Sequence, residues 1–225
     1  MSAAIAAIKT RSRPCIKVAI CAPKGGVGKT TLARALLVAA HAAGVNAVGV
    51  NVDEQTTLTA WGSARERRRS KAPEISQIDV LTHPLNDGRQ ALNATSGYSI
   101  AFIDTPPGHG QNAVAIRNLC DAADLVLIPT GVSEDDLAEV IPFAKQIAGA
   151  KAAFVLMKVN RRFRSFQKAQ SDLMKIARLC PAEVPALEEI HMYHRGGLTA
   201  LDVKRSAGSD QLASVWNFVR HEVQL

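Results

Sequence analysis

Residues 23–31 read Pro23-Lys24-Gly25-Gly26-Val27-Gly28-Lys29-Thr30-Thr31, and this stretch decides the fold. It follows an apolar run, Ile16–Ala22, that predicts a buried strand, and it leads into an Ala- and Leu-rich run, Thr30–Ala43, that predicts a helix ending at Gly44. Glycines let the backbone N–H groups of such a loop turn toward a phosphate, and the helix N-terminus adds a partial positive charge. The stretch therefore predicts a strand–loop–helix unit that binds nucleotide phosphates.

Two side chains of this loop have expected roles in phosphate chemistry. Lys29 would reach the β- and γ-phosphates, and the hydroxyl of Thr30 would bind Mg²⁺. The common GxxxxGK[ST] pattern begins with glycine, where this chain has Pro23, and an additional lysine, Lys24, precedes the glycine pair. The residues expected to bind the nucleotide are Lys24, Gly25, Gly26, Val27, Gly28, Lys29, Thr30 and Thr31.

The string KGGVGKTT resembles the deviant Walker A motif of the ParA/MinD family of P-loop ATPases. The resemblance extends over residues 16–210 and is densest over 16–60 and 98–140. It implies ATP and Mg²⁺ as cofactors, a homodimer in the ATP state, and slow hydrolysis that a partner stimulates. It also implies that Lys24 is the signature lysine, which reaches across the dimer interface to the partner's nucleotide.

A second loop with an acid follows the next apolar strand, at Asn51-Val52-Asp53-Glu54-Gln55. It resembles the DxDPQ switch segment of the family, with Asp53 in place of the second aspartate. A carboxylate here can orient the attacking water or hold the water shell of the metal. Asn51 replaces the first aspartate and Glu54 replaces the proline, so we expect hydrolysis to depend on Asp53 together with Lys24 and Lys29.

A third loop follows Ile100-Ala101-Phe102-Ile103-Asp104 and reads Thr105-Pro106-Pro107-Gly108. It resembles a Walker B motif with the family's DTPPG, in which Asp104 would hold Mg²⁺ opposite Thr30 and Asp53 would complete the metal site. Gly108 and its neighbours would form the second switch, which senses the γ-phosphate. We expect the nucleotide's base to bind near 158–160 and 189–195.

Strand-like and helix-like runs alternate along most of the chain. This alternation predicts an α/β fold, with a mostly parallel twisted sheet covered by helices on both faces, and ligands bound beyond the carboxyl ends of the strands. Strands are expected over 16–22, 45–52, 75–81, 98–104, 125–129 and 154–159. Helices are expected over 30–43, 56–69, 86–95, 113–121, 134–148, 163–179 and 211–223. We expect one P-loop ATPase domain, 15–225, preceded by a mobile basic arm, 1–14.

The net charge of +7 is unevenly distributed over the 225 residues. Segments 1–17, 61–72 and 158–178 carry +4, +4 and +6, so the rest of the chain is acidic. An apolar content of 47% excludes wholesale disorder, and an aromatic content of 4% argues against a stacking platform for single-stranded nucleic acid. The excess charge predicts a second polyanion besides the nucleotide.

Nonspecific duplex DNA is the expected polyanion, because it requires only Lys and Arg facing phosphates. The expected contacts are Arg161, Arg162, Arg164, Lys168, Lys175 and Arg178, of which the last three would share one helical face. The segment from Arg65 to Lys71 is a second candidate. The resemblance to short ParA-type partition ATPases implies a cytoplasmic, nucleoid-associated protein that positions plasmid or chromosomal DNA with a ParB-like or ribbon-helix-helix centromere-binding adaptor.

Two alternatives remain open. An orphan ATPase of this type would position a protein machine over DNA, and only its adaptor would differ. A MinD-like protein would bind the membrane through a basic amphipathic C-terminal helix. The apolar stripe of the last helix comprises Leu212, Val215, Trp216, Val219 and Val223, but the polar side is weakly charged. Such a stripe is more typical of core packing, so a membrane partner is not expected.

Overall fold

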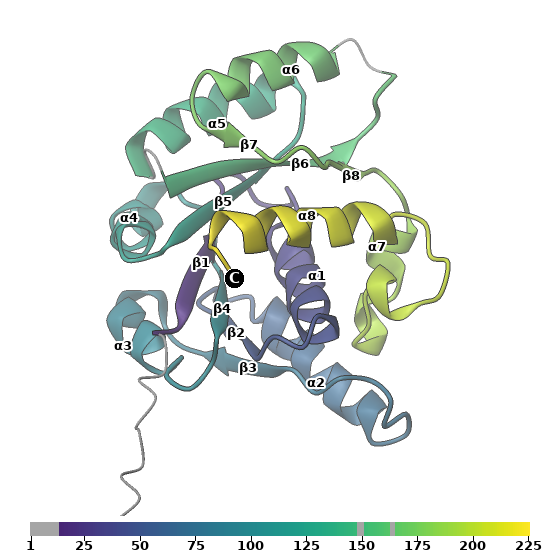
Figure 1. Ribbon diagram of the computed structural model, residues 1–225. Helices are drawn as coiled ribbons and strands as arrows, with labels where there is room; N and C mark the ends of the chain where they lie inside the picture. Colours follow the sequence, from purple (N-terminus) through teal and green to yellow (C-terminus); the bar gives the residue numbers. More distant parts are fainter. Residues whose placement is uncertain (1–13, 148–150, 163–164) are drawn as a thin grey trace, which may run out of the picture.

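The computed structural model describes residues 14–147, 151–162 and 165–225 (Figure 1). The arm expected over 1–14 therefore lies outside the described residues, apart from Pro14, and Arg164 does as well.

A single twisted sheet runs through the described part of the chain, in the order β3-β2-β4-β1-β5-β6-β7, with β8 paired to β6. The recorded strand pairs are all parallel, which confirms the expected α/β fold. The strands are β1 Ile16–Ile20, β2 Ala47–Asn51, β3 Asp79–Thr82, β4 Ile100–Asp104, β5 Leu125–Thr130, β6 Ala152–Val159, β7 Arg178–Leu179 and β8 Val184–Pro185. Asp104 is in register with Ile20 and with Asn51, so β1, β2 and β4 end level with one another.

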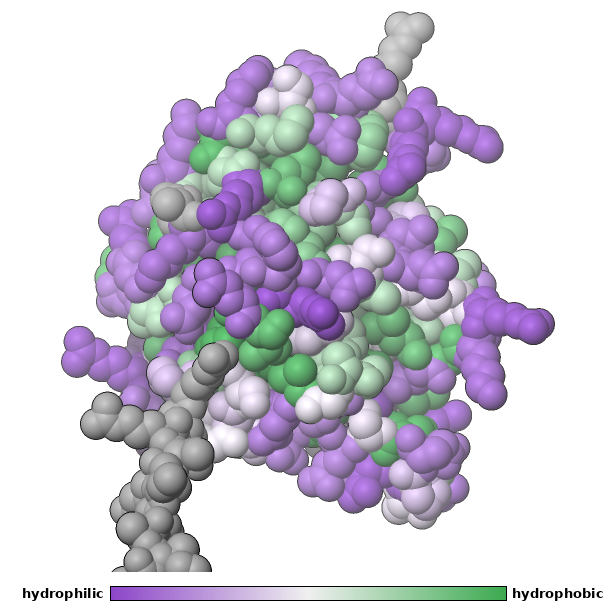
Figure 2. All heavy atoms as spheres, viewed as in Figure 1, coloured by the Kyte–Doolittle hydropathy of each residue, from purple (hydrophilic) through white to green (hydrophobic). Residues whose placement is uncertain are grey.

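Helices cover both faces of the sheet (Figure 1). One face carries α1 Lys29–Ala42, α2 Thr57–Arg69 and α8 Ser209–Glu222. The other carries α3 Gly88–Asn93, α4 Ala113–Asp121, α5 Glu134–Ile147 and α6 Ser165–Met174. A short helix, α7 Glu189–Met192, and the 3-10 turns η4 His194–Gly196 and η5 Ala200–Asp202 lie beside the first group. Figure 2 shows hydrophilic side chains around the outline of the first face and hydrophobic patches nearer its middle.

The apolar stripe of α8 is part of the core. Leu212, Val215, Trp216 and Val219 are at most 4% exposed, and α8 packs along α1. The Trp216 ring meets the edge of Phe102 on β4, with ring centroids 6.3 Å apart. The stripe therefore packs against the sheet, as its weak charge indicated. No helix in the described ranges is long and apolar enough to cross a membrane.

The basic helix expected over 163–179 is too long by several residues. Helix α6 ends at Met174, and Arg178–Leu179 forms the short edge strand β7, where the N–H of Cys180 donates to Phe154 O. The free edge of β6 offers this backbone partners that a helix would leave unused. Lys168, Lys175 and Arg178 consequently do not share one helical face, and that expectation was wrong.

Candidate nucleotide-binding site

The loop between β1 and α1 has the backbone of a phosphate cradle. Gly26 and Gly28 adopt φ of 72° and 104°, a region that strains residues with a Cβ. A Cβ on Gly28 would also lie 2.9 Å from Met157 Cε on β6. Gly28 is the N-cap of α1 and has no side chain to cap it, so the N–H groups of the first turn remain available to an anion.

Two lysines, the buried Lys29 and the exposed Lys158, donate to backbone carbonyls of this loop. Lys29, 7% exposed, donates from Nζ to Lys24 O at 3.0 Å. Burial lowers the pKa of Lys29, and the nearby Asp104 and Asp53 carboxylates oppose the shift. From the end of β6, Lys158 donates from Nζ to Gly26 O at 2.7 Å, and it does so from a left-handed backbone with φ 56°.

Asp104, at the end of β4, is the residue that best fits a metal ion. It is 1% exposed, and neither carboxylate oxygen has a hydrogen-bond partner among the described residues. Burial raises the pKa of Asp104 to about 6, while the nearby Thr30 hydroxyl and Lys29 oppose the rise. Two buried oxygens without a partner are costly, and a bound Mg²⁺ would satisfy them, with Thr30 beside it.

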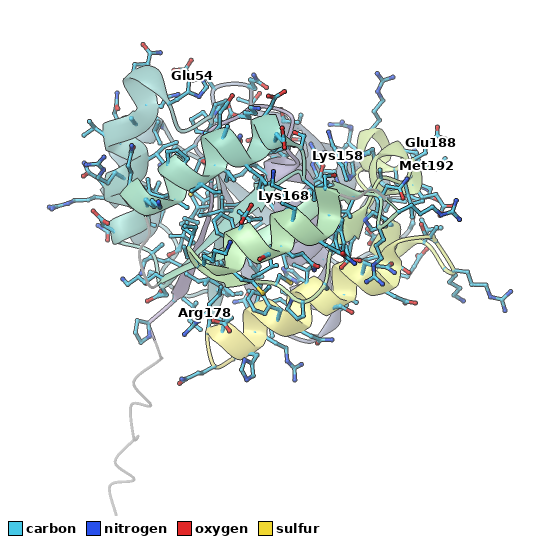
Figure 3. The ribbon with its side chains drawn as sticks, turned by 90° about the horizontal axis from the view of Figure 1, so that it is seen from above. Glu54, Lys158, Lys168, Arg178, Glu188 and Met192 are labelled. Atoms are coloured by element: carbon cyan, nitrogen blue, oxygen red, sulfur yellow. The ribbon has the colours of Figure 1, made fainter. Side chains whose placement is uncertain are left out.

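The Asp53 loop is held in place by Asn51. The amide Nδ2 of Asn51, fully buried at the end of β2, donates to Asp53 O at 2.8 Å, and Asp53 Oδ1 accepts from Gln55 N at 3.0 Å. Asn51 therefore stabilises the conformation of this loop and adds no charge to the site. Glu54 is exposed and points away from the region of Lys158 and Met192 (Figure 3).

A cavity of about 350 Å³ lies over the glycine loop, at the carboxyl ends of the strands. The loop contributes Gly25, Gly26, Gly28, Lys29, Thr30 and Thr31, and the rest of the wall is formed by Asp53, Gln55, Thr57, Pro107, Lys158 and His191. The cavity thus brings the glycine loop and the Pro107 loop together with Asp53. Lys158 and His191 also line it, in the two regions where the base was expected.

The chain matches, over residues 18–196, the family described as the CobQ/CobB/MinD/ParA nucleotide binding domain. The chain belongs to this family. A curated relative, the maintenance of carboxysome distribution protein A of Gloeobacter kilaueensis, is 29% identical over 197 residues, 86% of each chain.

Solved structures of similar fold include two nucleotide complexes. MinD of Pyrococcus horikoshii with Mg-ADP gives a TM-score of 0.71 at 18% identity, over 91% of this chain and 96% of that one. The ATP complex of a substituted McdA from Cyanothece gives a TM-score of 0.69 at 16% identity, over 95% of this chain and 98% of that one. The resemblance to ParA/MinD proteins is thereby confirmed, and Mg-ADP and ATP, found in these relatives, agree with the expected cofactors.

The lysine that the family's motif adds, Lys24, points away from this cavity. Its Nζ donates to Asp135 O at 3.1 Å and lies 3.2 Å from Glu139 Oε1 and 3.8 Å from Asp136 Oδ1. These groups belong to the first turns of α5. That helix begins as the sequence indicated, with Ser133 Oγ accepting from Asp136 N at 3.1 Å.

The sequence analysis singled out neither Arg34 nor His194, whose pKa values are both lowered by burial. Arg34 is buried in α1 and donates from Nη2 to Thr57 O at 2.8 Å, and burial lowers its pKa to about 10. Burial also lowers the pKa of His194 to about 4, with Arg34 and His191 adding to the effect. The only available signal was an arginine within an otherwise apolar helical run, which indicates that its side chain has a specific partner.

Most of the expected DNA contacts already have acidic partners. The ion pairs are Arg161–Glu183, Lys168–Glu134, Lys175–Asp172 and Arg178–Glu222. In the second basic segment, Arg65 is 1% exposed and binds Asp202, so it is a structural residue. The sequence could not show these pairs, since three of the acids lie more than 20 residues from their partners.

Proposed function

We propose that this chain is an ATPase that forms a dimer around ATP and uses the dimer to position a cargo over DNA. The observation that carries the proposal is the placement of the two loop lysines. Lys29 serves the chain's own cavity, whereas Lys24 lies on the acidic start of α5, outside that cavity. Lys24 does not contact its own cavity, so it can serve a second subunit's phosphates if dimerisation releases it from Asp135 O and Glu139.

Each residue of the site has a role in the proposed hydrolysis. Lys29 and the N–H groups of the glycine loop bind the phosphates, and Asp104 and Thr30 hold the metal. Bound Mg²⁺ would neutralise charge on the β- and γ-phosphates. Asp53 orients the water for attack, in a loop that Asn51 fixes through Asp53 O.

The second switch is joined to the phosphate loop by its backbone. Gly108 N donates to Ala22 O at 2.9 Å, one residue before the loop begins, and His109 Nδ1 lies 2.5 Å from Pro23 O. A change at the γ-phosphate would move this contact and thereby signal the nucleotide state to the surface.

The proposed partners are a second copy of the chain, duplex DNA and an adaptor that stimulates hydrolysis. The adaptor would be ParB-like or of the ribbon-helix-helix type for a DNA cargo. A cargo made of protein is a second candidate, and the curated relative favours it, because that protein's name refers to carboxysome distribution. A membrane role gains no support from α8, whose apolar stripe is buried.

Mobility shifts of a labelled duplex with ATP, with ADP and without nucleotide test this proposal. The wild type should shift DNA only with ATP, Lys29→Ala should lose nucleotide binding, and Lys24→Ala should bind nucleotide but form no ATP-dependent dimer in light scattering. A Lys24→Ala protein that still dimerises would refute the role of Lys24. A wild type that dimerises with ATP but never shifts DNA at low salt would refute the DNA role alone.

For the cargo, fluorescence imaging of the tagged chain in its native cell separates the two candidates. Loss of the gene should either scatter a replicon among daughter cells or disperse a protein assembly that otherwise tracks the nucleoid.

A further inference from the structure

We propose that duplex DNA binds this chain at the end of α2 and on η4, through Arg67, Arg68, Lys71 and Arg195, and not through segment 158–178. We call these four residues the α2–η4 patch. The inference rests on the proposed function, because it names the surface that would contact DNA phosphates.

Four cations of segment 158–178 are already paired with acids, and Arg162 is the expected contact that is exposed without an ion pair in the part of the chain that the structure describes. Lys168 Nζ lies 2.9 Å from Glu134 Oε1, and Lys175 Nζ lies 2.8 Å from Asp172 Oδ1. Arg161 is paired with Glu183, and Arg178, labelled in Figure 3, is paired with Glu222 on α8. A phosphate that approached these cations would have to displace a carboxylate, and the displaced carboxylate would repel it.

The α2–η4 patch has no such competition in the part of the chain that the structure describes. All four residues are exposed, and none makes an ion pair. The two nearest acids are engaged elsewhere: Glu66 accepts both Nε and Nη2 of Arg69, and Asp202 accepts both Nη1 and Nη2 of Arg65. Glu74 is exposed three residues after Lys71, without an ion pair to it.

A buried arginine fixes the two halves of the patch to each other. Arg65 donates from Nη1 to Gly197 O at 3.1 Å and binds Asp202 just beyond. Gly197 packs so closely on α2 that a Cβ there would lie 2.2 Å from Arg65 N, and a Cβ on Gly196 would lie 3.5 Å from Arg68 Nη1. The end of α2 and η4 therefore form one rigid surface, and binding would not need to order it.

The chemistry of the patch favours nucleic acid over a membrane. Three of its four residues are arginines, whose planar guanidinium groups bind phosphate oxygens through two hydrogen bonds. A peripheral membrane surface also needs apolar side chains to insert. The exposed large hydrophobic residues of the described chain are Val114, Met174, Leu187, Met192 and Leu225. None of them is on α2 or η4, and Met192 alone lies within three residues of a member of the patch, Arg195.

Fluorescence anisotropy with a labelled duplex of about 24 base pairs tests the patch, in Mg-ATP across a salt series. The test variant is Arg67→Gln/Arg68→Gln. The matched control, Arg89→Gln/Arg117→Gln, removes two exposed charges from α3 and α4 on the other face of the sheet. A third pair, Arg161→Gln/Lys168→Gln, tests the rival segment, and Arg195→Gln tests η4 on its own.

We expect Arg67→Gln/Arg68→Gln to weaken binding at least tenfold at about 0.1 M salt and to reduce the slope of log affinity against log salt by about 2 for each bound subunit. Arg195→Gln should reduce the slope by about 1, and the matched control should leave it unchanged. Thermal unfolding and ATP-dependent dimerisation should match the wild type in the patch, η4 and control variants, whose exposed side chains make no ion pair. The rival pair should lose some stability, because Arg161→Gln leaves the buried Glu183 without its partner.

Three results would overturn the inference while leaving DNA binding intact. In the first, Arg161→Gln/Lys168→Gln loses DNA binding and Arg67→Gln/Arg68→Gln does not. In the second, all the variant pairs lose DNA binding equally. In the third, the wild type floats with phosphatidylserine vesicles in ATP, and Arg67→Gln/Arg68→Gln alone abolishes this flotation while its DNA binding is unchanged. A wild type that dimerises but does not bind the duplex would overturn the DNA role and the patch together.

Discussion

Asp104 is a carboxylate that the fold buries without giving it a hydrogen-bond partner among the described residues. We predict that Asp104→Asn makes the nucleotide-free protein more stable at pH 8, by about 1 kcal/mol or more, because it removes a buried charge. The same change should abolish the gain in ATP affinity that Mg²⁺ gives over EDTA. Thermal unfolding and titration with a fluorescent nucleotide measure the two effects.

Asp53→Asn is the matched control for this prediction. Asp53 is only partly buried, and its carboxylate accepts from Gln55 N, so its removal should not stabilise the protein. If Asp104→Asn lowered the unfolding temperature without ligands, Asp104 would have a structural partner instead of a reserved place for a metal.

His194 should make the protein sensitive to acid. Its pKa is about 4 in the folded chain, against 6.5 for an ordinary histidine. The unfolded chain thus takes up a proton that the folded chain does not, and stability falls as the pH falls from about 6.5 toward 4. Since the ring is partly exposed, we expect His194→Gln to reduce the loss by only about 1 kcal/mol.

Urea unfolding at pH 7 and pH 5 checks this prediction, with His221→Gln as the control for an exposed histidine. The explanation fails if the wild type and His194→Gln lose equal stability between the two pH values.

At the scale of elements, Arg65 holds α2 to the segment that follows α7. We predict that Arg65→Ala costs about 3–5 kcal/mol, because it leaves Asp202 and Gly197 O without their buried partner. Arg67 is exposed two residues further along the same helix, and surface substitutions usually change stability by less than about 0.5 kcal/mol, so we expect Arg67→Ala to stay within that range. Chemical denaturation of both variants measures the difference, and a cost below about 1 kcal/mol for Arg65→Ala would show that the contact is not structural.

Helix α8 provides the second prediction at this scale. Trp216→Ala should cost about 3–5 kcal/mol, because the ring fills the space between α8 and β4. Asn217→Ala, on the exposed side of the same helix, should be nearly neutral. If Trp216→Ala left stability unchanged but abolished flotation with vesicles, α8 would be a membrane anchor instead.

The elements also show what a sequence can and cannot predict. The strands before Asp53 and Asp104 were predictable, because each is a short apolar run followed by polar residues. The ends of parallel strands lie at the same edge of the sheet, so the two acids were expected to lie close together. The end of α6 was not, because the sequence continues with helix-compatible residues and only pairing with β6 stops it. The burial of Arg65 was equally invisible, since its partner Asp202 is 137 residues away.

For the whole molecule, the nucleotide cavity is built by loops from strands across the sheet, so binding should stabilise the entire fold. We predict that Mg-ATP at about 100 times its dissociation constant adds about 2.7 kcal/mol to the free energy of unfolding. Lys29→Ala should lose this gain and Arg117→Ala, an exposed residue on α4, should keep it. Thermal unfolding with and without Mg-ATP measures the gain, and a gain that Lys29→Ala retained would place the nucleotide outside the cavity.

Lys29 and Lys158 both donate to carbonyls of the glycine loop, and this affects the heat-capacity change on nucleotide binding. Their ammonium groups fix the loop before any nucleotide arrives, so its conformational entropy is lost during folding and not during association. Phosphates then enter a site whose shape already exists, and the heat-capacity change of association reflects the surface that the nucleotide covers, without a contribution from a folding loop.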